Sequence, residues 1–281
     1  MFHALQHNGK KLRYTEKLKA YCKSKALDRR ITYKVFYPEV LIAGKTYPLL
    51  ILNDGQESGS IKIKETLELL TGENLIEPII VAGVYAGERM QEYGIAQQGD
   101  YAGRGSKAGL YTRFLLHEFI PHLGTWLPVS EKSSHNSIAG YSLGALSAFD
   151  IAWNNSDHFG NVGCFSGSFW WRTREWKKGR NVDRFRIAHD IVRTTENAPA
   201  SLKFWFQTGT LDEKSDRNGN GVIDSIDDTL DLIKELEKQN ILNGERIKYL
   251  EIEGGKHHPE TWAIAMKDFL VWAYGNKTRN Q

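Results

Sequence analysis

Short apolar segments alternate along this chain with longer segments in which apolar residues recur at helical spacing. Strand-like runs lie at residues 31–38, 47–53, 78–85, 137–141, 162–166, 202–208 and 246–253. Helical patterns lie between them, at residues 61–70, 110–126, 143–153, 185–195, 227–239 and 260–274. This regular alternation predicts an α/β protein.

The middle strands show no alternation of polar and apolar residues. Residues 49–52 (Leu-Leu-Ile-Leu) and 79–82 (Ile-Ile-Val-Ala) are apolar throughout, which is typical of strands covered on both faces. The first strands alternate more and favour an antiparallel N-terminal edge. We therefore expect a mostly parallel, doubly wound sheet with helices on both faces. No linker or internal repeat interrupts the sequence, so we expect a single domain over residues 1–281.

The composition narrows the class of protein. The chain is 41% hydrophobic and 25% charged, as in ordinary soluble proteins, and a net charge of +3 without a basic run argues against nucleic-acid binding. No apolar run is long enough for a membrane span, and residues 1–10 lack the apolar core of a signal peptide. Cys22 and Cys164 are far apart and are expected to be free thiols. A cytoplasmic location, with no membrane partner, is the expectation.

The pentapeptide at residues 140–144, Gly-Tyr-Ser-Leu-Gly, lies where a predicted strand meets a predicted helix. A serine at such a turn projects its Oγ above the sheet, and the flanking glycines allow the tight bend and close packing. Ser142 is therefore a candidate nucleophile. The alternative is a serine that merely caps the helix.

A serine nucleophile needs a base and an orienting acid, and in doubly wound hydrolases the acid precedes the histidine along the chain. Asp212 follows the strand at 202–208, with Glu213 as its rival. His257 lies in a glycine-led loop after the last strand, and the alternative, His258, precedes a proline as a helix-entry residue would.

Two backbone amides are candidates for an oxyanion hole. The Leu143 amide follows the nucleophile directly, and the Gln56 amide lies in the turn after the strand at 47–53. The glycine at position 55 frees the backbone to present the Gln56 amide inward.

Six motifs in order along the chain carry a resemblance to a known family. They are residues 47–56 (Tyr-Pro-Leu-Leu-Ile-Leu-Asn-Asp-Gly-Gln), 89–93, 114–121, 138–144, 164–171 (Cys-Phe-Ser-Gly-Ser-Phe-Trp-Trp) and the Gly-Gly-Lys-His loop at 254–257. The chain resembles the putative esterase family of α/β-hydrolases, which includes enterochelin, feruloyl and acetylxylan esterases and S-formylglutathione hydrolase.

The resemblance implies an α/β-hydrolase fold and hydrolysis of a small-molecule carboxylic ester through an acyl-enzyme. It implies Ser142 as nucleophile, His257 as base, Asp212 as acid, and the amides of Leu143 and Gln56 as oxyanion donors. The sequence departs from the family at Ala145, where a second glycine is usual. A Ser-His dyad without Asp212 is an alternative, since some siderophore esterases work with those two residues.

Further residues are candidates for the substrate pocket. Arg89, Glu92 and Tyr93 follow a strand end, where they line the pocket or form a structural ion pair. Trp170 and Trp171 follow the strand after the nucleophile helix and are expected to form an aromatic wall, with core packing as the alternative.

Residues 216–227 match an EF-hand-like calcium loop. Oxygen-bearing side chains occupy loop positions 1, 3, 5, 9 and 12, and a glycine at position 6 permits the sharp turn. The predicted ligands, including one backbone carbonyl at Val222, are Asp216, Asn218, Asn220, Val222, Asp224 and Asp227. We expect a structural Ca²⁺ of modest affinity and no cofactor for catalysis. The alternative is a surface turn that binds nothing.

Two other functions are compatible with the same residues. An acyltransferase would resolve the acyl-enzyme with an alcohol instead of water. A non-catalytic, calcium-stabilised binding protein would use the aromatic cleft without chemistry.

Overall fold

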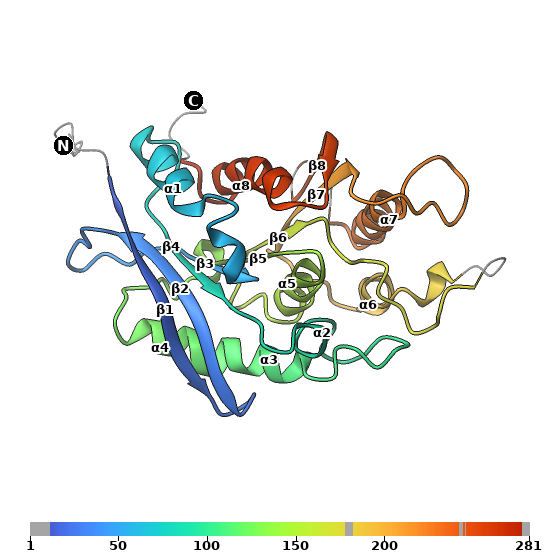
Figure 1. Ribbon diagram of the computed structural model, residues 1–281, viewed down its shortest axis with the longest axis horizontal. Coiled ribbons are helices and arrows are strands. Elements are labelled where there is room, and N and C mark those ends of the chain that lie inside the picture. Colours follow the sequence, from blue (N-terminus) through green and yellow to red (C-terminus); the bar gives the residue numbers. More distant parts are fainter. Residues whose placement is uncertain (1–11, 178–181, 242–243, 245, 277–281) are drawn as a thin grey trace.

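A single eight-stranded sheet forms the centre of the computed structural model, which describes residues 12–177, 182–241, 244 and 246–276. Its strand order is β1-β2-β4-β3-β5-β6-β7-β8. The strands are β1 (Tyr14–Ser24), β2 (Arg29–Pro38), β3 (Leu49–Asn53), β4 (Ile80–Val84), β5 (Ser137–Tyr141), β6 (Asn161–Phe165), β7 (Lys203–Leu211) and β8 (Ile247–Lys256). Figure 1 shows the long β1–β2 hairpin at one end of the sheet and β8 at the other.

The sheet is antiparallel at its N-terminal edge and parallel elsewhere. β2 pairs antiparallel with β1 and with β4, and every pair from β4 to β8 is parallel. β3, β4, β5 and β6 are buried at every position, as their apolar sequences predict. The predicted parallel sheet with an antiparallel edge is confirmed.

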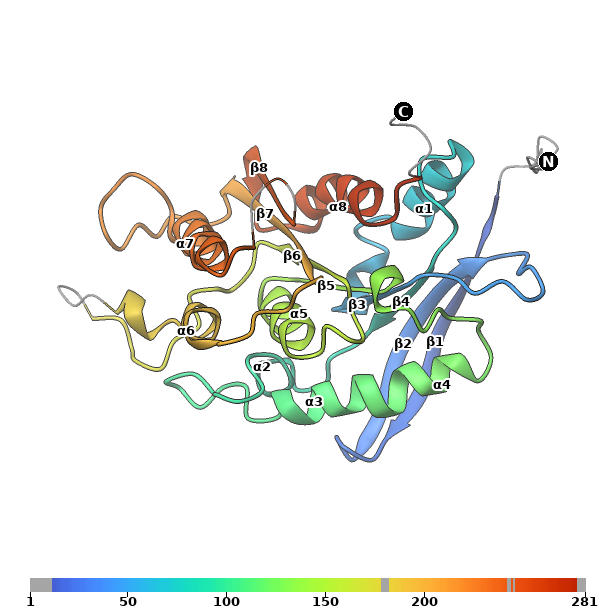
Figure 2. The same cartoon turned by 180° about the vertical axis from the view of Figure 1, so that it is seen from behind.

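Helices cover both faces of the sheet (Figures 1 and 2). On one face α1 and α8 pack on Leu52, Tyr141 and Phe165, and on the other α3 to α7 enclose the larger apolar core. The α-helices are α1 (Ile63–Gly72), α2 (Arg89–Glu92), α3 (Ala108–Phe114), α4 (Ile120–Gly124), α5 (Leu143–Asn154), α6 (Ile187–Thr194), α7 (Asp224–Lys238) and α8 (Pro259–Tyr274).

Three elements differ from the sequence prediction. β1 was not expected, because its sequence, Tyr-Thr-Glu-Lys-Leu-Lys-Ala-Tyr-Cys-Lys-Ser, is rich in lysine, as suits an edge strand. The single helix predicted at 110–126 is divided into α3 and α4 by a π-helical turn, Leu115–Phe119. α7 begins at Asp224 and not at Asp227, so the last part of the predicted calcium loop is helical.

Of the two expectations, no membrane span and no signal peptide, the structure bears only on the first. Within the described residues, no helix has both the length and the apolar character that crossing a bilayer requires. Residues 1–10, on which the expectation of no signal peptide rests, lie outside the described residues.

Candidate active site

Ser142 occupies a sharp turn between β5 and α5. Its backbone has φ 54° and ψ −119°, a conformation that a non-glycine residue rarely adopts. Among the described residues, the Ser142 side chain makes no hydrogen bond that caps α5. The alternative that Ser142 merely caps the helix therefore has no support. The turn is tight because Gly140 lies against Gly144: a Cβ on Gly140 would be 2.4 Å from the Gly144 carbonyl oxygen.

The turn after β3 packs directly beside this serine. A Cβ on Gly144 would be 2.8 Å from the Asp54 carboxylate, and the Asn53 side chain donates to the Gly144 carbonyl oxygen at 2.8 Å. Asp54 itself has a left-handed backbone, φ 57°, and begins the short helix η1 (Gly55–Ser58). Gln56 therefore lies in a segment that contacts the nucleophile turn.

Arg89 fixes this turn to β5. Its guanidinium donates two hydrogen bonds to the buried Asp54 carboxylate and a third, of 3.3 Å, to the Tyr141 carbonyl oxygen. Tyr93 is fully buried, and its hydroxyl accepts a hydrogen bond from the Asp54 amide. Arg89 and Tyr93 thus hold the backbone beside Ser142.

Glu92 is part of a structural ion pair. It is buried, binds the Arg29 guanidinium through both carboxylate oxygens, and accepts a hydrogen bond from the Gly87 amide. These contacts lower the pKa of Glu92 against the effect of burial, which alone would raise it. Of the two roles the sequence left open for Glu92, the contacts match the ion pair.

The ends of β7 and β8 meet at the same edge of the sheet as Ser142. A Cβ on Gly209 would be 2.4 Å from the Gly255 carbonyl oxygen, so only glycine permits this approach. Asp212 turns back onto the end of β7, where its Oδ2 accepts from the Gly209 amide at 3.0 Å. His257 is the first residue after β8.

Asp212 and His257 influence each other's ionisation. Burial raises the pKa of Asp212, and the Gly209 amide, the Ser166 hydroxyl and His257 oppose this rise. Burial lowers the pKa of His257, Asp212 opposes this effect, and Arg89 adds to it. The His257 ring also packs edge-on against Trp262, with centroids 5.3 Å apart. A neutral imidazole next to a carboxylate can act as a general base.

The two rival residues make other contacts. His258 is the N-cap of α8, and its Nδ1 accepts a weak hydrogen bond of 3.4 Å from the Glu260 amide. Glu213 accepts from the Ser225 backbone, and its pKa is raised by burial and by Asp224. His258 and Glu213 therefore make their contacts at the starts of α8 and α7.

Ser166 and Ser168, in the turn after β6, were not assigned a role from the sequence. The Ser166 hydroxyl accepts a hydrogen bond of 3.0 Å from Trp262 Nε1 and favours the charged form of Asp212. Ser168 Oγ lies 3.3 Å from Ser142 Oγ. Both serines lie in the 164–171 motif that carries the family resemblance, but the motif does not reveal their contacts, because these depend on the approach of elements distant in the sequence.

The two tryptophans differ in exposure. Trp171 is fully buried, so core packing accounts for it, whereas Trp170 is half-buried. Arg104, from the segment at 94–107 before α3, stacks over both indole rings and pairs with the buried Asp100. Sequence reasoning missed this contact, which binds the segment to the tryptophans.

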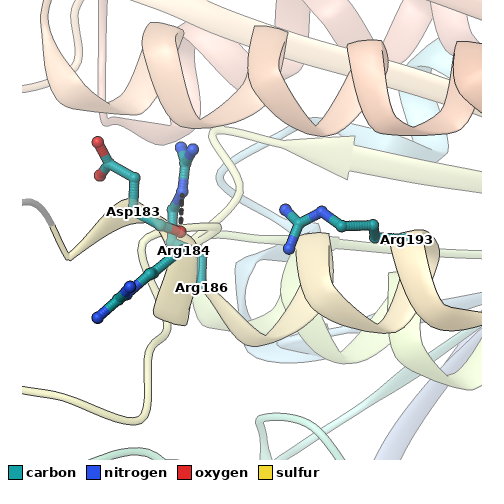
Figure 3. Close-up of a pocket in the computed structure, with 4 residues that line it drawn as sticks. All are labelled: Asp183, Arg184, Arg186 and Arg193. Carbon is teal, nitrogen blue, oxygen red and sulfur yellow. Dashed lines mark hydrogen bonds between the residues drawn. The ribbon is translucent and has the colours of Figure 1, made fainter.

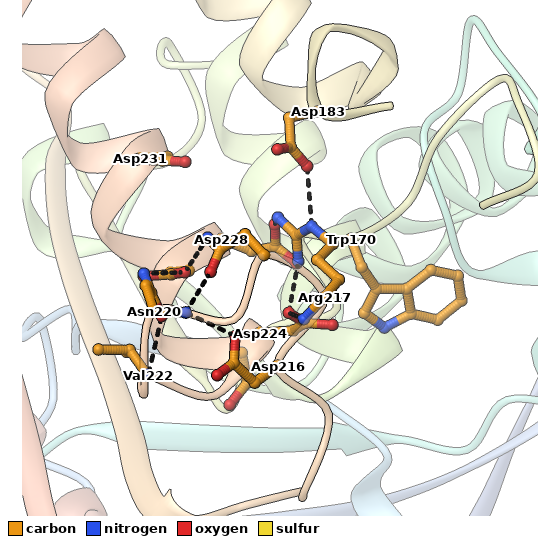
Figure 4. Close-up of polar contacts among 12 residues, drawn as sticks. Trp170, Asp183, Asp216, Arg217, Asn220, Val222, Asp224, Asp228 and Asp231 are labelled. Atoms are coloured by element: carbon orange, nitrogen blue, oxygen red, sulfur yellow. Dashed lines mark hydrogen bonds and ion pairs between the residues drawn. The ribbon is translucent and has the colours of Figure 1, made fainter. Parts of the chain in front are cut away.

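The predicted calcium ligands are partly gathered at one end of α7 (Figure 4). Asn218 and Asn220 each donate to Asp227 Oδ2 at 2.9 Å, and Asp216 accepts from the amides of residues 219, 220 and 221. Asp224 instead binds Arg217, through the Arg217 amide and guanidinium. Over the described residues, no three His, Cys, Asp or Glu side chains form a group that could hold a metal ion.

A buried ion network lies beneath this loop. The Asp228 carboxylate, 1% exposed, binds the guanidinium groups of both Arg186 and Arg217. Arg217 also pairs with Asp183 (Figure 4). Arg186 pairs with Asp231 as well. The network joins the loop at 216–227 to α7 and to the segment before α6.

A cavity of about 390 Å³ lies beside this network and is lined by Asp183, Arg184, Arg186 and Arg193 (Figure 3). Arg186 is bound to two carboxylates, and Arg193 pairs with Asp190 and Glu235. Because most of the positive charge is already balanced, the cavity does not have the character of an anion site.

The strand order, the strained serine at the β5–α5 turn, and the positions of Asp212 and His257 after β7 and β8 are those of the α/β-hydrolase fold. The model of the family described as putative esterase matches residues 24–272. The chain belongs to the putative esterase family.

One curated protein is similar to this chain over part of its length. The uncharacterized protein YjcH of Bacillus subtilis (strain 168) is 26% identical over 140 residues, which are 50% of this chain and 56% of that relative. The chain thus spans little more than half the length of this curated relative.

Solved structures show the same fold at low identity. A ferulic acid esterase has a TM-score of 0.70 and 16% identity, with 94% of this chain and 98% of that chain covered. An enterobactin esterase from Shigella flexneri has a TM-score of 0.71 and 18% identity, with 92% and 59% covered. The BES protein from Bacillus cereus has a TM-score of 0.66 and 15% identity, with 93% and 95% covered.

Proposed function

We propose that this protein hydrolyses carboxylic esters of small molecules through an acyl-enzyme on Ser142. The observation that carries the proposal is the backbone of Ser142, which keeps a strained φ of 54° at the end of β5. Such strain persists where the surrounding structure holds it, and at a strand-to-helix turn it exposes the hydroxyl to substrate. Family membership and the names of the structural neighbours support an ester substrate.

In this mechanism His257 takes the Ser142 proton as Oγ attacks the ester carbonyl carbon. The alcohol leaves with the proton that His257 returns. Water then attacks the acyl-enzyme, gives its proton to His257, and releases the acid. Asp212 orients His257 and stabilises the imidazolium that forms between these steps.

The amides of Leu143 and Gln56 are proposed to bind the oxyanion. Leu143 is the first residue of α5, where amide groups have no partner within the helix. Gln56 lies in η1, which the Asp54–Gly144 contact holds against the same turn. Trp170 is half-buried and follows Ser168 closely in the chain, and it is proposed as the aromatic wall of the substrate pocket.

A fluorophosphonate probe tests the proposal most directly, since it reacts covalently with an activated serine. We expect the probe to label wild-type protein, and Ser142→Ala to lose both labelling and p-nitrophenyl acetate turnover, by about 10⁶-fold in kcat. Ser130→Ala is a matched control, because Ser130 is as buried as Ser168, at 5%, but lies before the short helix η3 (Ser133–His135) and not in the Ser142 turn. A wild-type protein that neither labels nor turns over short-chain esters would refute the esterase and favour the binding protein.

We also propose that residues 216–227 hold a structural Ca²⁺. The support is the ligand spacing together with the convergence of Asn218 and Asn220 on Asp227. If the side-chain amides of Asn218 and Asn220 rotated so that oxygen and NH₂ group exchanged places, their oxygens would point toward a cation shared with the Asp227 carboxylate. The ion would stabilise the chain that follows Asp212 and take no part in the chemistry.

A further inference from the structure

Ser168 makes two contacts with Ser142. The Ser168 amide donates to the Ser142 carbonyl oxygen at 3.1 Å, and the two Oγ atoms are 3.3 Å apart. The Ser142 amide in turn donates to the Phe165 carbonyl oxygen at 2.9 Å. The nucleophile turn is therefore fastened to the turn after β6 through the main chain, and only the Oγ contact requires a serine at position 168.

The position of Ser168 is fixed by its neighbours. Ser168 is 5% exposed, and its carbonyl oxygen accepts from the Trp171 amide at 3.2 Å. The next residue, Phe169, is buried between Phe149 and Phe206. Because the backbone of Ser168 is held in this way, its side chain stays beside Ser142 Oγ without a rearrangement of the turn, which favours electrostatic stabilisation.

The number of protons on the two hydroxyl groups sets the direction of the hydrogen bond between Ser168 and Ser142. Each hydroxyl carries one proton. If Ser142 gives its proton to His257, Ser142 Oγ can only accept from Ser168. In the acyl-enzyme Ser142 Oγ has no proton at all, so Ser168 must again be the donor. A single arrangement, with Ser168 donating, suits every state of the cycle.

We propose that Ser168 is a further catalytic residue, which donates a hydrogen bond to Ser142 Oγ and stabilises the negative charge that develops on this oxygen. The proposal rests on the esterase function of Ser142. In acylation the O–H bond of Ser142 breaks, its proton moves to His257, and the Oγ–carbon bond forms. When water releases the acyl group, that bond breaks, its electron pair returns to Oγ, and His257 gives Oγ the proton that it took from the water. Ser168 keeps its own proton throughout.

The separation of 3.3 Å is long for two hydroxyl groups, whose hydrogen bonds are usually about 2.7–2.8 Å. Such a contact shortens when the acceptor gains charge, because charge-assisted hydrogen bonds are shorter and stronger. Ser168 therefore binds the reacting oxygen more tightly in the transition state than at rest, and this difference is what lowers a barrier.

The test compares Ser168→Ala and Ser168→Thr with wild-type protein and with Ser130→Ala. Two rates are measured: fluorophosphonate labelling of Ser142, which needs only its attack, and kcat/KM for p-nitrophenyl acetate. We expect Ser168→Ala to lower both about tenfold, the size of one hydrogen bond to developing charge, with the loss in kcat and not in KM. Threonine keeps the hydroxyl and should recover most of the loss.

Several results would overturn the role of Ser168. Rates in Ser168→Ala within twofold of wild type would remove it. Equal losses in Ser168→Ala and Ser168→Thr, at unchanged melting temperature, would assign the effect to packing, and so would an equal loss in Ser130→Ala. Failure of the wild-type protein to label or turn over would instead refute the esterase function itself, so the two failures are distinguishable.

Discussion

Arg89 binds the carboxylate of Asp54 through both Nε and Nη2, and each of the two hydrogen bonds is 2.8 Å long. This pair joins the turn after β3 to the chain after β4, and Arg89 extends it to β5 through the Tyr141 carbonyl oxygen. The three segments that surround Ser142 are therefore held by one guanidinium group.

Replacing this guanidinium should destabilise the fold as well as the site. Arg89→Ala leaves the charge of Asp54, whose side chain is 4% exposed, without its partner. We expect a loss of about 1–3 kcal/mol in the free energy of unfolding, measured by urea denaturation, together with slower ester hydrolysis. Lys107→Ala breaks an exposed pair with Glu88 and should cost less than about 0.5 kcal/mol. Equal losses in the two variants would contradict this account.

Gly140 should tolerate no side chain. The Cβ of Gly140→Ala would lie 2.4 Å from the Gly144 carbonyl oxygen, so α5 must move away from β5. We expect a loss of about 1–3 kcal/mol or more and no measurable esterase activity. Gly72→Ala, at the end of α1 with no atom within 4 Å of the new Cβ, should be neutral or stabilising by up to about 1 kcal/mol. Thermal unfolding of both variants provides the comparison.

Activity should persist to lower pH than an ordinary histidine allows. Burial and Arg89 hold the pKa of His257 below 6.5, so the neutral, basic form survives as the pH falls. We expect the acidic limb of kcat/KM against pH to lie below that value. Asp212→Asn removes the charge that favours the imidazolium, so the limb should move further down and the rate should fall by about 10²–10⁴-fold.

Glu213→Gln is the matched control for the acid. Glu213 lies next to Asp212 but contacts the start of α7, so its loss should leave the acidic limb in place. A shift of the limb in Glu213→Gln, with none in Asp212→Asn, would reassign the acid to Glu213. If the rate of Asp212→Asn stays close to that of wild type, this result would instead indicate a Ser-His dyad.

Asp150 should make stability depend on pH in the opposite sense to most carboxylates. Burial raises its pKa from 3.8 to about 6, against the hydrogen bonds from Ala96 and Asn154. Because the native state holds this proton more tightly than the unfolded chain, its stabilising effect is complete below about pH 4. It is lost as the pH rises through about 6, and amounts to about 3 kcal/mol at most.

The difference between wild-type protein and Asp150→Asn isolates this effect. The variant has no proton to lose at position 150, so the difference in free energy of unfolding should change between about pH 4 and 6 and be flat above. A difference that does not vary with pH over that range would show that Asp150 keeps an ordinary pKa.

Calcium should raise the melting temperature if the 216–227 loop binds it in the folded state only. At a hundredfold excess over Kd the gain is about 2.7 kcal/mol, and a chelator should reverse it. Asp227→Asn removes the carboxylate on which Asn218 and Asn220 converge and should abolish the shift, whereas the exposed Asp157→Asn should not. Identical melting temperatures in saturating calcium and in chelator would refute the calcium site.

Sequence patterns predicted the inner sheet because burial on both faces leaves a continuous apolar run, as at Leu49–Asn53. β1 escaped prediction for the complementary reason: it is an edge strand in which Lys17 and Lys23 are exposed, and its register with β2 shifts between Lys17 and Ala20. The early start of α7 was missed because the loop motif and the first helical turn share the residues from Asp224 to Asp227.

The candidate site likewise contains residues that sequence reasoning proposed and residues that it missed. Ser142, Asp212 and His257 follow strand ends and carry local signals, glycines above all, so sequence reasoning proposed them. Ser168 and Arg104 make contacts through side chains that meet only after the sheet has formed. Their contacts depend on tertiary approach, which a single sequence does not encode locally.

Asp228, buried between Arg186 and Arg217, anchors the 216–227 loop at its base and not at its tip. The residues between Arg217 and Asp224 are largely exposed, and their hydrogen bonds remain within the loop. The tip is thus mechanically separate from the hydrolase sheet. The exposed residues 218–221 form a natural graft site, where a different ion-binding sequence or a reporter peptide can be exchanged while the fold around Ser142 stays as it is.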